Sequence, residues 1–138
     1  MKSKQIAEAV RLRLQIAPGV ALGPGKADLL EGIRQTGSIA AAGRRMRMSY
    51  KRAWQLVDEL NDLFDVPLVA ASKGGSGGGG AALTKAGTDV LVRYRRMHAA
   101  CCAAIVDDLS ALHRHRSSAA DSVKKKSARV RAQRSDSI

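Results

Sequence analysis

The sequence has few cysteines, few aromatic residues and no long apolar run. Its two cysteines, Cys101 and Cys102, are adjacent, so they offer neither a disulfide framework nor the spacing of metal ligands, and we expect small, buried hydrophobic residues. The longest uncharged apolar run, residues 99–106, is much shorter than the roughly 18 residues that span a bilayer. Residues 1–11 lack the apolar stretch of a secretory signal. We therefore expect a cytoplasmic protein without a membrane segment.

Acidic residues are also scarce. The 138 residues include 24 Lys and Arg against 12 Asp and Glu, a formal net charge of +12. Such an excess indicates an acidic partner, either nucleic acid or an anionic membrane surface, and does not choose between them. The length allows one domain with an appended tail, which excludes a large two-domain enzyme.

The sequence lacks a recognisable catalytic or cofactor-binding constellation. The glycine-rich run formally contains GxGxxG at Gly75, Gly77 and Gly80, but a run this rich in glycine matches the pattern almost automatically. The acidic residue expected about 20 positions later is missing, and no Gly-Lys-Ser/Thr follows. We expect the three histidines, His98 included, to be solvated helix residues without an acidic or cysteine ligand partner. We predict no enzyme, metal or cofactor.

The amino-terminal third predicts a hairpin and a helix. Residues 11–16, RLRLQI, alternate charged and apolar side chains as a half-buried strand does. Pro18-Gly19 marks a turn into a second strand at residues 20–22. Residues 26–36 then have apolar side chains at helical spacing, and Gly37 is a typical carboxy-terminal stop.

Residues 37–64 predict two helices joined by a tight turn. Ser38 and Ser49 each precede a helical run and are suitable N-caps. The first helix, about residues 39–46, is short and alanine-rich. The second, about residues 49–64, has a broad apolar face that includes Trp54, which we expect in the core rather than as a stacking platform. This is a helix-turn-helix whose second helix can enter a major groove as a recognition helix.

The rest of the chain predicts a second hairpin, a long helix and a tail. Strands at residues 66–71 and 81–83 flank the glycine run, and Thr84 can cap a helix over about residues 85–115. That helix would be about 45 Å long, longer than a small core can cover, so its apolar stripe predicts a homodimer. The stripe contains Leu91, Tyr94, Cys101, Ile105, Leu109 and Leu112.

The composition changes at Ser117, where Ser, Ala, Lys and Arg begin to dominate. We therefore expect a domain over residues 1–116 and a basic, disordered tail over residues 117–138.

Basic residues without a neighbouring acid surround the predicted turn. Because an N-terminal helix end favours anions, cations placed there indicate a bound anion such as DNA phosphate. Base readers are expected among Lys51, Arg52 and Gln55. Phosphate contacts are expected from Arg47, Ser49 and Tyr50. The predicted DNA-binding set further contains Arg44 and Arg45, and, from a glycine-rich wing at residues 73–80, Lys73, Ser76, Gly77 and Gly78.

Three segments together carry a family resemblance: GSI at residues 37–39, SYKRAW at 49–54 and GGSGGGGAALT at 74–84. With them, residues 11–112 resemble the amino-terminal domain of the molybdate-responsive transcription regulators, the ModE family. The first segment also resembles the broader LysR-type winged helix. The resemblance implies a dimeric winged helix-turn-helix domain in which residues 49–52 begin the recognition helix, residues 73–80 form the wing tip and the helix after Thr84 dimerises.

The chain differs from the family pattern at three points. Full-length members have carboxy-terminal molybdate-binding domains where this sequence has its basic tail, so molybdate is not expected as a cofactor. Arg47 stands where the family often has a small turn residue. Ser76 replaces a wing position that is often basic.

The sequence thus predicts a mainly α fold with small β hairpins: a winged helix-turn-helix with a long carboxy-terminal dimerisation helix. Its predicted partners are double-stranded DNA and a second copy of the chain, with no membrane. The predicted function is a dimeric transcriptional regulator that reads an inverted-repeat operator. A non-specific architectural nucleic-acid-binding protein is the main alternative, and a protein-interaction module that uses the long helix is another.

Overall fold

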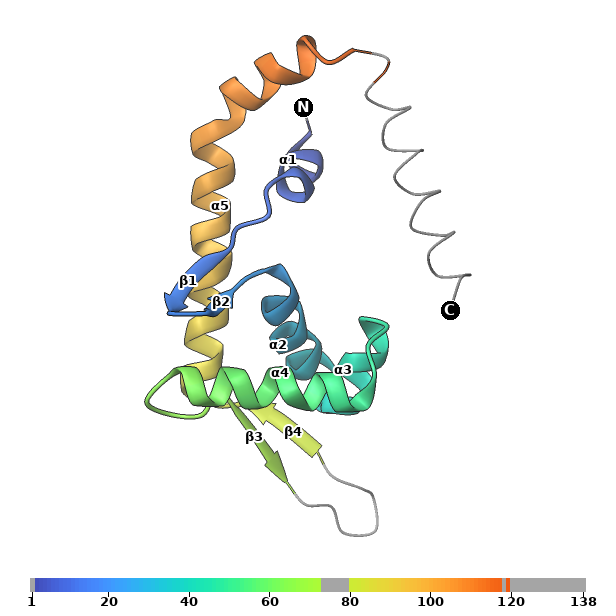
Figure 1. Ribbon diagram of the computed structural model, residues 1–138, viewed down its shortest axis with the longest axis vertical. Coiled ribbons are helices and arrows are strands. Elements are labelled where there is room, and N and C mark those ends of the chain that lie inside the picture. The colour runs from blue at the N-terminus through green and yellow to red at the C-terminus, as the bar shows by residue number, and fades with distance from the viewer. Residues whose placement is uncertain (1, 73–79, 118, 120–138) are drawn as a thin grey trace. The chain divides into compact units, whose positions relative to one another are not determined.

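The computed structural model describes residues 2–72, 80–117 and 119. Residues 2–103 form one compact unit, and the described residues from Ala104 onward belong to a second. The fold is mostly helical with two small antiparallel hairpins, as the sequence predicts (Figure 1). Its elements are α1 Ser3–Ala9, β1 Leu14–Ala17, β2 Val20–Leu22, α2 Pro24–Thr36, α3 Ile39–Arg45, α4 Tyr50–Leu63, β3 Val69–Ser72, β4 Gly80–Leu83 and α5 Lys85–Arg114.

The amino-terminal segment differs most from the prediction. Helix α1 was not predicted from the sequence; it has seven residues, and Ile6 is its one buried residue. Strand β1 begins at Leu14 rather than at residue 11, because β2 has only three residues and Leu14 already pairs with the last of them, Leu22. Gly19 provides the positive φ of 77° that the hairpin turn requires.

The core of residues 2–103 is formed by α2, α3, α4 and α5 together with Leu22 and the base of the β3–β4 hairpin. We call this base, with the buried residues Leu68, Val69 and Ala81, the wing base. Leu29, Leu30 and Ile33 of α2 are fully buried because apolar residues at this spacing share one helix face. Leu91 and Tyr94 of α5 complete the core at 4% and 1% exposure. The prediction that Leu91 and Tyr94 belong to the dimer surface is therefore wrong, since the same chain already buries both side chains.

Tyr94 is fixed by a contact that the sequence pattern could not show. Its hydroxyl donates a 2.8 Å hydrogen bond to the carbonyl oxygen of Leu12. Burial raises the pKa of Tyr94 above its ordinary value, because desolvation disfavours the phenolate. The stability that this tyrosine contributes is therefore present below the pKa of an unfolded tyrosine and is lost as pH rises through the higher folded pKa.

The β3–β4 hairpin is tied at its base to the helices. Asn61 of α4 accepts hydrogen bonds at Oδ1 from the backbone N–H groups of Leu68 (2.9 Å) and Val69 (3.0 Å), and its Nδ2 donates to the Val69 carbonyl. On the other strand, the Ala81 N–H donates to the carbonyl of Gly37 at 2.8 Å. These bonds set the direction in which the wing leaves the helix-turn-helix.

Helix α5 begins at the predicted cap. The Thr84 hydroxyl accepts a hydrogen bond from Gly87 N–H at 3.0 Å, and the helix continues for 30 residues. Two expectations for this helix are wrong. His98 is half-buried with its Nε2 2.8 Å from the Val10 carbonyl rather than solvated, and both Cys101 and Cys102 are half-buried rather than buried.

None of the helices that the structure describes is both long and apolar enough to cross a membrane.

Candidate nucleic-acid interface

The turn between α3 and α4 has a defined hydrogen-bond pattern. The N–H of Met48 donates to the Gly43 carbonyl, and the N–H of Arg47 donates to the Arg44 carbonyl, both at 3.0 Å. These two bonds form a Schellman motif at the end of α3, with Arg47 at the position where a left-handed residue is required. Arg47 has a φ of 57° and, among the described residues, is the single non-glycine residue with positive φ.

Replacing Arg47 with glycine is expected to increase the free energy of unfolding by about 1 kcal/mol, because glycine avoids the steric cost of left-handed backbone. The same change removes one cation from the interface and should weaken DNA binding. Denaturant unfolding and DNA titration measure the two effects.

The matched control is Arg44→Gly, which removes the same charge from the last turn of α3, where the backbone is still helical. It should weaken DNA binding similarly but lower stability by about 1 kcal/mol, because glycine is unfavourable within a helix. If both variants lost stability, the strain assigned to Arg47 would be wrong.

Close packing and two serine caps fix the angle between the helices. An added Cβ at Gly43 of α3 would lie 2.9 Å from the Ala53 Cβ of α4, so glycine is required for this approach. Ser38 Oγ accepts a hydrogen bond from Ala41 N–H, and Ser49 Oγ accepts one from Arg52 N–H, each at 3.1 Å. Ser49 thus caps α4, and its hydroxyl hydrogen is available to a phosphate oxygen.

The predicted cations gather at this turn and are exposed to solvent. Neither α3 nor α4 has an acidic residue in its first turn, so nothing there offsets their charge. The exposed cations are Arg44, Arg45, Arg47, Lys51 and Arg52; we call them the turn cluster.

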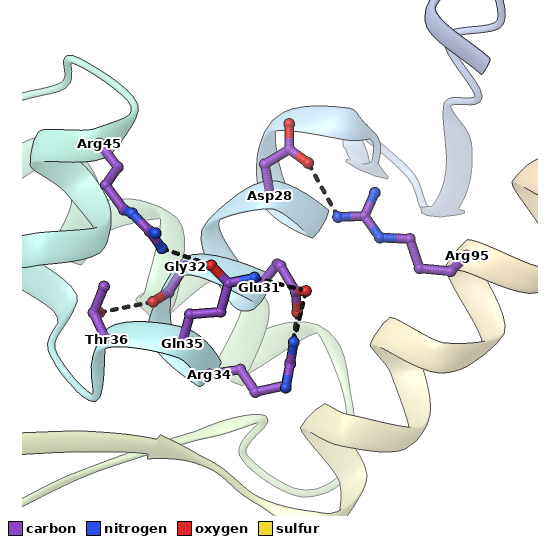
Figure 2. A network of polar contacts seen from close by, with 8 residues as sticks. All are labelled: Asp28, Glu31, Gly32, Arg34, Gln35, Thr36, Arg45 and Arg95. Atoms are coloured by element: carbon purple, nitrogen blue, oxygen red, sulfur yellow. Dashed lines mark hydrogen bonds and ion pairs between the residues drawn. The ribbon is translucent and has the colours of Figure 1, made fainter. Parts of the chain in front are cut away.

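Arg45 of the turn cluster is held by α2. Its Nη1 donates a 2.8 Å hydrogen bond to Gln35 Oε1, and Gln35 in turn donates to Glu31 (Figure 2). Glu31 also accepts two hydrogen bonds from Arg34, and these bonds lower the pKa of Glu31. Gln35 was not predicted as a site residue, since no sequence spacing indicates that it contacts Arg45 ten residues later.

One side of helix α4 faces solvent and the opposite side faces the core. Lys51 and Gln55 lie together on the solvent-facing side, opposite the buried Ala53, Val57 and Leu60. This side is the one that can read base edges.

The flanks of α4 carry the remaining predicted residues. Tyr50 is 61% exposed, and its ring meets the Trp54 ring edge-on at 6.1 Å between centroids. Trp54 is half-buried against the core, as predicted. Arg52 lies on the opposite flank, where it lines a surface hollow with Leu56 and Glu59.

Some predicted site residues cannot be placed. Lys73, Ser76, Gly77 and Gly78 lie outside the described residues, so the predicted wing contacts stay a prediction. Of the predicted dimer residues not already assigned to the core, Ile105 and Leu112 are exposed, and Cys101 and Leu109 are half-buried. Across residues 2–72 and 80–117 there is no group of three or more His, Cys, Asp and Glu side chains that could hold a metal ion.

The helix-turn-helix of α3 and α4, the β3–β4 hairpin that follows it and the exposed turn cluster together define the class of this protein. It carries a winged helix-turn-helix DNA-binding domain. Residues 27–88, which extend from α2 to the start of α5, match the family described as "Bacterial regulatory helix-turn-helix protein, lysR family".

Three relatives are each similar to a part of the chain. The molybdenum-pterin-binding protein MopA of Rhodobacter capsulatus is 40% identical over 94 residues, which are 68% of this chain and 36% of MopA. MopB of the same organism is 43% identical over 81 residues, 59% of this chain and 30% of MopB. The molybdenum transport protein ModE of Azotobacter vinelandii is 39% identical over 87 residues, 63% of this chain and 32% of ModE. The resemblance to ModE regulators is therefore confirmed, and the match spans about a third of each relative's length.

Proposed function

We propose that this chain acts as a transcriptional regulator that binds an inverted-repeat operator as a homodimer. The observation that carries the proposal is the turn cluster, five exposed cations on the end of α3, the turn and the start of the capped recognition helix, whose first turn has no acid. In a dimer, the two α4 helices would read half-sites about one helical turn, or roughly 34 Å, apart. DNA binding in this proposal requires no cofactor and involves no catalysis.

A DNA titration followed by amide chemical shifts tests the site. With a duplex added to the full chain, the largest shifts should fall on residues 44–55. Shifts confined to other parts of residues 2–103 would contradict the assigned interface. Adding molybdate should leave both the shifts and the affinity unchanged if no cofactor is needed.

The dimer is supported by apolar residues exposed on α5. Leu112 is 69% exposed and Ile105 is 38% exposed, although both are large aliphatic side chains that gain by burial. The predicted dimer would cover this part of α5 with the same helix of a second copy.

Leu112→Lys is expected to shift the dimer to monomer, because it places a charge in the proposed helix contact. The monomer should keep its stability, since Leu112 is exposed there. His113→Lys adds a charge at the next, exposed residue and should leave the dimer intact. Sedimentation equilibrium measures the mass; equal masses for the two variants would contradict this contact.

The glycine-rich wing gives a further prediction. Replacing residues 77–79 with alanine should lower DNA affinity without changing the dimer, because glycine lets backbone N–H groups approach a phosphate closely. DNA titration and sedimentation measure the two properties. Unchanged affinity would mean that the run is a passive loop.

A further inference from the structure

A surface hollow of about 410 Å³ lies beside the recognition helix. Its walls are the β1–β2 hairpin with Arg13, the first residues of α2 with Lys26, and the flank of α4 with Arg52 and Glu59. The sequence prediction did not include Arg13 or Lys26 in the interface, because only the tertiary fold brings the hairpin and α4 to the same hollow.

The charges around the hollow favour an anion. Lys26 is only 13% exposed at its side chain; its Nζ lies 3.2 Å from Glu59 Oε2 and donates to the Ala21 carbonyl at 2.8 Å. The carboxylate in the wall is therefore already neutralised. Arg13 and Arg52 are both exposed, and neither guanidinium has a hydrogen bond or ion pair to any residue in the described part of the chain.

The amino-terminal end of α2 adds to the positive electrostatic potential in the hollow. Gly23 is its N-cap without a side-chain hydrogen bond, and the first turn has no acidic residue. Gly23 and Gly25 both line the hollow, and an added Cβ at Gly25 would meet nothing within 4 Å. The backbone here is therefore accessible, and a helix amino terminus favours negative charge. The amino terminus of α2 thus strengthens the attraction of Arg13 and Arg52 for an anion, but it is not an anion site by itself.

The position of the hollow indicates which anion reaches it. Arg52, Leu56 and Glu59 are spaced by four and three residues and so share one flank of α4, about 100° around the helix from the side of Lys51. A helix of about 10–12 Å diameter nearly fills a major groove about 12 Å wide. The flanks of such a helix face the phosphate backbones that border the groove.

We propose that this hollow receives a backbone phosphate of the bound DNA, held by Arg13 and Arg52, and that Arg52 is a phosphate contact rather than a base reader. The inference rests on the proposed DNA-binding function. Arginine suits the role because its planar guanidinium can donate two parallel hydrogen bonds to a phosphate.

Arg13→Ala tests the hollow without altering the helix-turn-helix. For a dimer, this change should make the slope of log affinity against log salt shallower by about 2, since two phosphate contacts are lost. Affinity should fall by the same factor for the operator and for random duplex, because phosphate contacts carry no sequence information. Arg11→Ala, which removes another exposed arginine two residues away and outside the hollow, should change neither.

Arg52→Ala tests the assignment of Arg52. It should weaken the binding of operator and random duplex equally, whereas Gln55→Ala, on the solvent-facing side of α4, should weaken operator binding more. An altered base preference in Arg52→Ala would overturn the phosphate role of Arg52. Thermal unfolding of each variant confirms that it is folded.

Other outcomes separate this inference from the proposed function. If the chain binds DNA and Arg13→Ala behaves as Arg11→Ala does, the phosphate site is wrong and the proposed function stands. If the unaltered chain binds no DNA, both are wrong. If inorganic phosphate alone shifts the amides of Gly23, Gly25 and Lys26 and Arg13→Ala abolishes these shifts without changing DNA affinity, the hollow binds free phosphate and the DNA contact is overturned.

Discussion

Replacing Gly87 with alanine is expected to lower the free energy of unfolding by about 3 kcal/mol or more. A Cβ at this position would lie 2.0 Å from the carbonyl oxygen of Leu68 and 2.9 Å from its carbonyl carbon. Both are backbone atoms, so no side-chain rotation relieves the clash, and overpacking of this kind usually costs about 1–3 kcal/mol and occasionally more.

The clash falls where the wing and α5 meet. The Leu68 carbonyl also accepts the Thr84 N–H at 2.9 Å, and Leu68 itself is fully buried. Moving the two segments apart would therefore break this hydrogen bond and open the core around Leu68.

Denaturant unfolding of Gly87→Ala and Gly25→Ala checks the effect. Gly25 lies within α2 and has free space around its added Cβ, so alanine there should stabilise by about 0.5–1 kcal/mol. The two variants make the same chemical change with opposite expected signs. Similar stabilities for both would show that α5 and the wing base are not packed as closely as the structure indicates.

Removing three cations of the turn cluster, Arg44, Arg45 and Arg47, by alanine substitution is expected to abolish most of the electrostatic affinity for DNA. If a dimer neutralises about eight phosphates, its salt slope is near −7, and affinity falls on the order of 10⁴-fold between 50 and 200 mM salt. The triple variant would keep about two of those contacts. Its slope should be near −2, and the same salt change should weaken binding only about tenfold.

Fluorescence anisotropy with labelled duplex across this salt range measures the slopes. A control that replaces Lys4, Arg11 and Arg93 with alanine removes as many exposed cations outside the turn cluster, and it should keep the slope near −7. Equal slopes for the two triple variants would show that the affinity comes from net charge alone. That result would favour the non-specific architectural alternative.

The elements that the sequence predicted well are those specified by neighbouring residues. Ser38, Ser49 and Thr84 each cap a helix as predicted, because a cap depends on residues only two or three positions away. Gly37 ends α2 in the left-handed conformation for the same reason. The helix-turn-helix could therefore be located from local spacing.

The errors concern contacts between distant segments. Tyr94 and Leu91 fit the apolar stripe of a dimer helix, but that stripe is partly buried by the chain's own core, and Tyr94 bonds the carbonyl of Leu12. His98 contacts Val10 in the same way. Periodicity identifies an apolar face without identifying what covers it, so the boundary between core and dimer surface could not be read from the sequence.

Sequence reading by α4 can be tested by selecting the DNA ligands of the full chain from a random library. We expect an enriched inverted repeat whose half-sites are centred about one helical turn apart. Recovery of DNA without any enriched sequence would contradict sequence reading by α4, even if the recovered DNA bound tightly.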